Sequence, residues 1–164
     1  MIFETYFEKV TGTLEKIKDT QVDKMHEAAR MVANVIKNDG IIYIFGCGHS
    51  HLIGLDCFYR AGGLANVCAM LDTDLMLHNG AAKSSAMEKM SGIARPIFER
   101  YCLTEKDMLF VIPTSGKNAV PVEMAQVATE HHIPNVSVVA SAYFGDKKDK
   151  PMLYVHYSKV LSNL

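Results

Sequence analysis

The sequence predicts an α/β fold in which a parallel sheet is covered by helices. Two observations support this prediction. Short apolar runs rich in β-branched and aromatic residues, at 41–45 and 108–112, have the composition of strands that are buried on both faces. Helix-length segments with apolar residues at helical spacing separate such runs, and strands that alternate with helices form parallel βαβ units.

Composition indicates one globular domain, residues 1–164, because 49% of the residues are hydrophobic and 21% are charged. A formal net charge of −1 gives no basic surface, so no nucleic-acid partner is expected. No apolar stretch approaches the ~20 residues of a membrane span, and the first residues lack the basic flank of a signal peptide. The four cysteines show no CxxC spacing, which is typical of thiols in a reducing compartment. We therefore expect a cytoplasmic protein without a membrane partner.

Residues 1–39 are expected to form a helical lead-in of two helices, ahead of an α/β core over 40–164. Apolar residues recur at helical spacing over 3–17 and again over 22–36. Asp19-Thr20 lies between them and can cap the second helix. The lead-in is interpreted either as a dimerisation element or as a simple cover for one sheet face.

The core continues after the first strand with a helix over 51–60 and a candidate strand over 66–70. Residues 74–78 are predicted as a third strand or an extended loop. Ser85 and Glu88 have the spacing of a capping box that opens a helix. Gly92 and Pro96 are expected to divide that helix, because proline suits a first turn and breaks a helix interior.

The last third of the chain begins with the strand over 108–112. A helix capped by Asn118 is expected next, with Pro121 tolerated in its first turn. A further strand is predicted over 136–140. Residues 151–164 fit a strand or a helix equally well.

Two loops follow strands and carry the residue types that bind phosphate. They are Gly46-Cys47-Gly48-His49-Ser50 and Pro113-Thr114-Ser115-Gly116-Lys117-Asn118. Small residues, hydroxyls, backbone N–H groups and a helix start are what a phosphate monoester requires. Ligands of parallel sheets bind outside the carboxyl ends of the strands, where both loops lie. The sequence therefore predicts a phosphate site between the two loops.

Other interpretations of the first loop remain open. The glycines can serve only a tight turn. A Rossmann-type nucleotide enzyme is a further alternative, because Asp72 stands roughly where a ribose-binding acid would, although His51 occupies the place of the third fingerprint glycine. Cys47, His49 and His51 alternate, but alternate residues on such a turn need not converge, and no carboxylate cluster completes a ligand set. Neither a metal nor a cofactor is expected.

The loop residues resemble a known family. Gly46-x-Gly48-x-Ser50 and Thr114-Ser115-Gly116-x-Asn118 are similar to the two phosphosugar loops of SIS (sugar isomerase) domains. The runs 48–51, 58–64 and 115–125 resemble the poorly characterised bacterial SIS proteins often labelled as phosphoheptose isomerases. The resemblance covers most of residues 3–141.

This resemblance implies a three-layer α-β-α sandwich around a five-stranded parallel sheet, assembled as a homodimer or homotetramer. It implies a phosphosugar site with Ser141 as the hydroxyl of a third loop. By counting, the catalytic glutamate of the isomerases falls near Arg60 and their metal-binding histidine near Asp56. The closing helix of the domain is expected to be short or missing. The residues expected to bind the phosphosugar are Gly46, Gly48, His49, Ser50, Thr114, Ser115, Gly116, Asn118 and Ser141.

The resulting functional hypothesis is a protein that binds a phosphorylated sugar and acts as an isomerase or a lyase-like enzyme. Aldose–ketose isomerisation needs a base that moves a proton beside a carbonyl group, and Glu88 and His49 are the candidates. Glu88 has a second interpretation as the capping-box partner of Ser85. The alternative function is a non-catalytic sensor that binds the same sugar phosphate and shifts an interface.

Overall fold

The computed structural model describes residues 1–140 and the backbone of 160–163. Its centre is a parallel sheet of five strands in the order β2-β1-β3-β4-β5. The strands are β1 (Ile42–Phe45), β2 (Val67–Met70), β3 (Met108–Val111), β4 (Asn135–Ala140) and β5 (Val160–Asn163). The sequence predicted the first four, and the resemblance implied a fifth. β5 shows that the ambiguous segment 151–164 contains a strand.

The strand order places β1 between β2 and β3. Ile42 is paired with Val67 on one side and with Met108 on the other. In the Rossmann order the third strand lies beside the second, whereas here it lies beside the first, as in flavodoxin-like sheets. Successive strands are added to one side of β1 and then to the other, so the strand order reverses between β1 and β3. Such a switch point forms the ligand-binding crevice of an open sheet.

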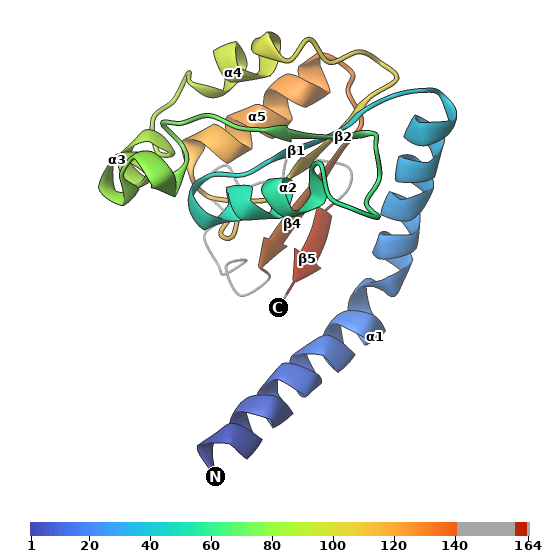
Figure 1. Ribbon diagram of the computed structural model, residues 1–164, viewed down its shortest axis with the longest axis vertical. Coiled ribbons are helices and arrows are strands. Elements are labelled where there is room, and N and C mark those ends of the chain that lie inside the picture. The colour runs from blue at the N-terminus through green and yellow to red at the C-terminus, as the bar shows by residue number, and fades with distance from the viewer. Residues whose placement is uncertain (141–159, 164) are drawn as a thin grey trace.

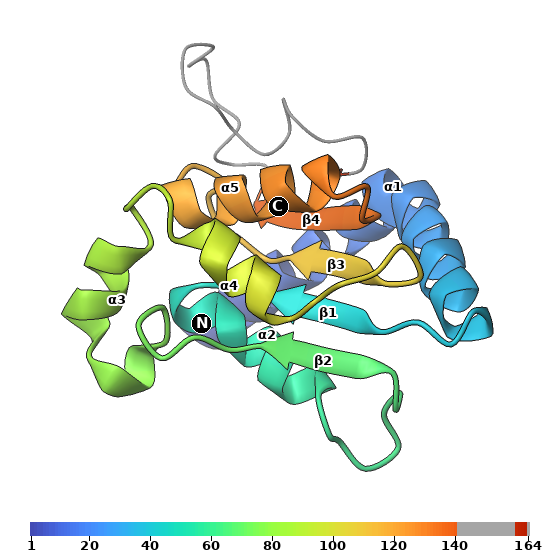
Figure 2. The same cartoon turned by 90° about the horizontal axis from the view of Figure 1, so that it is seen from above.

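Helices cover both faces of the sheet, which confirms the predicted three layers (Figure 2). One face packs on α4 and α5, and the other packs on α2 and the second half of α1. The helices are α1 (Ile2–Lys37), α2 (His51–Cys57), α3 (Ala81–Met87), α4 (Ala94–Arg100) and α5 (Ala119–Glu130), with short 3-10 turns at η1 (Gly48–Ser50) and η2 (Leu77–Asn79).

Alternation along β1 explains why the sheet has two cores. Ile42 and Ile44 pack into the cluster that contains Ala28 and Val35 of α1. Phe45 packs into the opposite cluster, with Phe98 of α4 and residues of α5. Successive side chains of a strand point to opposite faces, so an uninterrupted apolar run supplies both cores.

The lead-in is one continuous helix, so the prediction of two helices was wrong. No glycine or proline lies between Thr13 and Lys37 to end a helix. Asp19-Thr20 does not act as a cap, because the Thr20 hydroxyl donates back to the Lys16 carbonyl at 2.7 Å. That bonding pattern often bends helices, and Figure 1 shows α1 changing direction part-way along. The N-terminal half extends beyond the body of the domain (Figure 1).

The region between β2 and β3 corrects the prediction of a capping box. Gly80 is the N-cap of α3, so Ser85 lies in the helix interior and Glu88 is the C-cap residue. The broken helix itself is confirmed, since α3 ends before Gly92 and Pro96 lies in the first turn of α4. Residues 74–78 form a turn that leads into η2, not a strand. Among the described helices, none combines the length and apolar character needed to cross a membrane.

Candidate functional site

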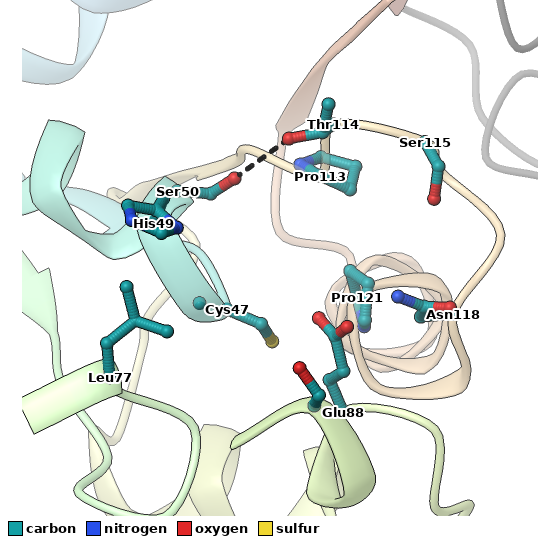
Figure 3. A pocket seen from close by; sticks show the side chains of 12 residues that line it. Cys47, His49, Ser50, Leu77, Glu88, Pro113, Thr114, Ser115, Asn118 and Pro121 are labelled. Carbon is teal, nitrogen blue, oxygen red and sulfur yellow. Dashed lines mark hydrogen bonds between the residues drawn. The ribbon is translucent and has the colours of Figure 1, made fainter. Parts of the chain in front are cut away.

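The two predicted loops meet at the switch point of the sheet. The loop after β1 leads through η1 into α2, and the loop after β3 leads into α5. Because β1 and β3 are neighbours, their carboxyl ends lie side by side. The Ser50 and Thr114 hydroxyl oxygens are 3.4 Å apart, so side chains of the two loops are in contact (Figure 3).

A cavity of about 240 Å³ lies between these loops and the end of α3 (Figure 3). It collects side chains from three segments that are distant in the chain. Its lining residues are Cys47, Gly48, His49, Ser50, Leu77, Ser85, Glu88, Pro113, Thr114, Ser115, Asn118 and Pro121. Most of the polar groups that the sequence analysis selected therefore face one space.

The two glycines of the first loop are required for different structural reasons. A Cβ on Gly46 would lie 2.6 Å from the Ser50 backbone, so only glycine lets the chain turn back this tightly. Gly48 has a φ of 56°, a left-handed conformation that glycine adopts without strain.

Two N–H groups of the first loop are used by the fold. Gly48 N–H donates to the Leu75 carbonyl at 2.8 Å, and Ser50 N–H donates to the Cys47 carbonyl at 3.0 Å. These two donors are directed at protein acceptors, contrary to the expectation that they are aimed at a phosphate. The side chains that this loop presents to the cavity are the Cys47 thiol, the exposed His49 imidazole and the Ser50 hydroxyl.

The second loop is different. Within the described chain, no backbone acceptor is bonded to the N–H groups of Ser115 and Gly116. Gly116 has a φ of 63°, which again suits glycine. Asn118 is the N-cap residue of α5, as predicted, but its side chain makes no capping hydrogen bond and lines the cavity (Figure 3). This loop therefore combines N–H groups, a hydroxyl and a helix N-terminus, the groups that bind anions.

Glu88 and Ser85 enter the cavity from the end of α3. The Glu88 carboxylate points into the space between Cys47 and Pro121 (Figure 3). Its backbone carbonyl accepts a hydrogen bond from Val120 N–H at 3.1 Å, which ties the end of α3 to the first turn of α5. The capping-box interpretation of Glu88 is wrong, because this side chain faces a half-buried cavity and not a helix start.

Cys47 is a cavity residue that the sequence analysis did not select. It is buried, with 8% of its surface exposed. Burial raises the pKa of its thiol well above the usual range, and the carboxylates of Glu88 and Asp72 raise it further. The thiol is therefore protonated at neutral pH, and it supplies a weak donor beside the carboxylate. Its position between the two glycines of the first loop was the sequence feature that could have placed it in the site.

Comparison with known proteins decides the family. The family model described as SIS domain matches residues 5–140. The chain belongs to the SIS domain family.

Curated relatives of this SIS domain are UPF0309 proteins. One from Caldanaerobacter subterraneus subsp. tengcongensis is 40% identical over 143 residues, which cover 87% of this chain and 58% of the relative. One from Listeria innocua is 37% identical over 149 residues, which cover 91% of this chain and 60% of the relative. The chain therefore spans about three fifths of the length of these relatives.

Solved structures with the same fold include two phosphoheptose isomerases. The enzyme from Francisella tularensis matches with a TM-score of 0.69 and 16% identity, covering 98% of this chain and 81% of that one. The enzyme from Neisseria gonorrhoeae matches with a TM-score of 0.65 and 18% identity, covering 98% of this chain and 84% of that one. At this identity the likeness shows the fold alone.

The positions that the resemblance implied for a catalytic glutamate (Arg60) and a metal ligand (Asp56) lie outside the cavity of this SIS domain. Asp56 and Arg60 form an exposed ion pair with each other and do not line the cavity. No three histidine, cysteine or acidic side chains within the described residues are grouped to hold a metal. The residues present at these positions thus do not fit a metal site.

Two further predicted residues, Gly46 and Gly116, are buried behind the cavity wall and shape the loops without lining the space. Ser141 lies outside the described residues. The residues that the sequence analysis missed are Cys47, Leu77, Ser85, Pro113 and Pro121. Leu77 was missed because residues 74–78 were left open between a strand and a loop, and Ser85 because it was assigned to a helix cap and not to a helix interior.

Proposed function

We propose that this SIS domain binds a phosphorylated sugar in the cavity and acts on it as an isomerase or a lyase-like enzyme. The observation that carries the proposal is the position of Glu88. A carboxylate faces the same small cavity as a loop rich in anion-binding groups. An anion site and a potential base in one space are what proton transfer on a sugar phosphate requires.

The phosphate group belongs at the second loop in this proposal. Ser115 offers its hydroxyl, Ser115 and Gly116 offer N–H groups, and the 12-residue helix α5 begins beside them. Neutral donors together with the positive end of a helix dipole favour a phosphate dianion. The sugar chain then extends toward the first loop and α3.

Glu88 is the proposed base for isomerisation. Its carboxylate takes the proton from the carbon next to the carbonyl group, and the electron pair of that C–H bond forms an enediolate. The same carboxyl group returns the proton to the neighbouring carbon, which completes the change from aldose to ketose. His49 also lines the cavity. It can protonate the carbonyl oxygen that gains charge and then take the proton from the neighbouring hydroxyl as that oxygen becomes the new carbonyl, so that one proton moves between the two oxygens. The Thr114 and Ser50 hydroxyls and Asn118 are left to orient the sugar.

A sensor is the second function to test. In a sensor the same residues would bind a sugar phosphate without converting it to a product. The screening step is a thermal shift with the 164-residue protein against sugar phosphates and against NAD. A ligand at a hundred times its dissociation constant stabilises the folded state by about 2.7 kcal/mol, which a melting curve resolves easily. Stabilisation by NAD and by no sugar phosphate would support the nucleotide alternative.

Turnover then separates enzyme from sensor. Sugar phosphates that stabilise the protein are incubated with it in D₂O, and NMR follows deuterium at the carbon next to the carbonyl. Proton abstraction by a base exchanges that hydrogen with solvent, so an isomerase incorporates deuterium and a sensor does not. The cytoplasmic location and the homo-oligomeric state expected from the sequence stay predictions.

A further inference from the structure

His51 is a buried histidine that the proposed chemistry does not use. It is the first residue of α2, and only 2% of its surface is exposed. Its Nδ1 is bonded to the carbonyl oxygen of Gly48. A carbonyl oxygen can only accept, so the hydrogen is on Nδ1. Nε2 is buried and has no hydrogen-bond partner within the described chain.

The partner of His51 lies in the wall of the cavity. Gly48 has both backbone groups occupied, since its carbonyl accepts from His51 and its N–H donates to the Leu75 carbonyl. Both bonds act on a residue with left-handed backbone, the one that directs His49 and Ser50 toward the cavity. Each of the two peptide groups that flank the Gly48 Cα is therefore held by one hydrogen bond, and neither can turn without breaking a buried hydrogen bond.

The same hydrogen-bond chain reaches the proposed base. The Leu75 carbonyl also accepts from the Ser84 hydroxyl, at 2.9 Å, and Ser84 is buried in α3. Glu88 N–H donates to the Ser84 carbonyl at 3.0 Å, one helical turn further on. Leu75 is thus a shared acceptor that joins the first loop to the helix that carries Glu88.

Packing supports the same connection. The His51 ring lies edge to face with the ring of His78, with 5.0 Å between their centroids. His78 belongs to η2, and the first residue of η2, Leu77, lines the cavity. The imidazole is therefore held between the first loop and the segment that leads to α3.

We propose that His51 is a positioning residue for the sugar end of this site. Its Nδ1–H holds the Gly48 carbonyl, which fixes His49 and Ser50 and sets their distance from Glu88. The expected effect of His51 on sugar binding rests on the proposed function, whereas its hydrogen bond to Gly48 does not. Loss of the bond should disturb contacts to the sugar while leaving the phosphate contacts of the second loop intact.

Two substitutions separate this role from simple core packing. His51→Asn keeps an N–H donor two bonds beyond Cβ, where Nδ1 stands, whereas His51→Gln places its amide nitrogen one bond further away. The first readout is hydrogen exchange of the Gly48 amide. This amide is bonded to the Leu75 carbonyl, so its exchange reports how firmly the Gly48 backbone is held. We expect near wild-type protection in His51→Asn and about tenfold faster exchange in His51→Gln, because loss of the neutral hydrogen bond on the Gly48 carbonyl lets this backbone open more often.

The second readout is the affinity for two probes, inorganic phosphate and fructose 6-phosphate. In His51→Gln, phosphate affinity should stay within about threefold of wild type, while the additional affinity for the sugar phosphate should fall by about tenfold. His51→Asn should restore it. If His51 only fills the core, the two variants should behave alike in both readouts. Any difference between them should then follow their melting temperatures.

Failure of each idea is distinguishable. If the wild-type protein binds neither probe, the proposed function of the cavity loses its support, and the Gly48 exchange still tests whether His51 holds the Gly48 backbone. If Gly48 exchanges equally slowly in wild type, His51→Asn and His51→Gln, the positioning role of His51 is wrong whatever the protein binds.

Discussion

The hydroxyl oxygens of Ser50 and Thr114 lie 3.4 Å apart, although the two residues are separated by 64 positions in the chain. Parallel pairing of β1 with β3 brings them together, because Ser50 and Thr114 both follow the carboxyl ends of those strands. The contact joins the two loops directly above the switch point of the sheet. A small anionic ligand is therefore expected beside this pair and not at the strand starts.

The first prediction is that phosphate or sulfate occupies this cavity among Ser50, Ser115 and Asn118. These polar side chains line one space at the N-terminus of α5, which favours negative charge. A crystal structure at high phosphate concentration checks it. An ordered anion elsewhere, with the cavity empty, would contradict the prediction.

The second prediction concerns Ser115→Ala. The variant removes a hydroxyl donor to the phosphate, and a hydrogen bond to a charged group contributes roughly 1.5–3 kcal/mol. Affinity for a sugar phosphate should fall by about ten- to a hundredfold, as measured by calorimetry. Ser91→Ala is the matched control, because Ser91 is exposed and does not line this cavity. Equal affinity in both variants would remove Ser115 from the phosphate site.

The third prediction concerns thiol reactivity. The thiolate is the nucleophile, and the pKa of Cys47 is raised first by burial and then by the carboxylates of Glu88 and Asp72. Cys47 should therefore react with iodoacetamide at pH 8 much more slowly than the exposed Cys57 and Cys102. Peptide mass spectrometry after timed labelling measures the three rates. Labelling of Cys47 as fast as Cys57 would show that the cavity is more open and more polar than the structure indicates.

The fourth prediction is self-association through α1. Phe3, Tyr6 and Phe7 are 70%, 64% and 65% exposed, which leaves a large apolar stripe on the half of α1 that extends from the domain (Figure 1). The protein should sediment as an oligomer at tens of micromolar, and Phe3→Glu with Phe7→Glu should shift it to monomer. Lys24→Glu, at an exposed polar position, is the control. A monomeric wild-type protein would refute the prediction.

Local pattern was sufficient to predict the first four strands and the two loops that line the cavity. β1 and β3 are short apolar runs, and each is followed by small and hydroxyl-bearing residues of the types that bind phosphate. The strand pattern and the composition of the loops therefore indicated the same fold and the same site. The long lead-in was misread because Asp19-Thr20 resembles a cap. Only the structure shows Thr20 bonding back to Lys16 inside an uninterrupted helix. A residue of capping type marks a helix start only where the preceding helix has ended, and the residue types around Asp19-Thr20 do not decide whether it has.

The sequence named Glu88 as a candidate base but could not decide between that interpretation and a capping box, for a related reason. Ser85 and Glu88 satisfy the spacing of a capping box, but Gly80 begins α3 instead. Which face of this seven-residue helix meets the cavity depends on tertiary contacts, one with Leu75 in the preceding turn and one with Val120 in a distant helix. The buried thiol of Cys47 became part of the site through the same long-range packing.

The last prediction separates binding from chemistry at Glu88. Glu88→Gln preserves the shape of the side chain and most hydrogen bonds but removes the base. If Glu88 moves the proton, sugar-phosphate affinity should stay within about threefold, while deuterium incorporation from D₂O should fall by at least about a hundredfold. Glu105→Gln, at an exposed residue outside the cavity, should change neither quantity. Full exchange activity in Glu88→Gln would exclude this carboxylate as the base and would direct the same test to His49, the other titratable side chain proposed for proton transfer in the cavity.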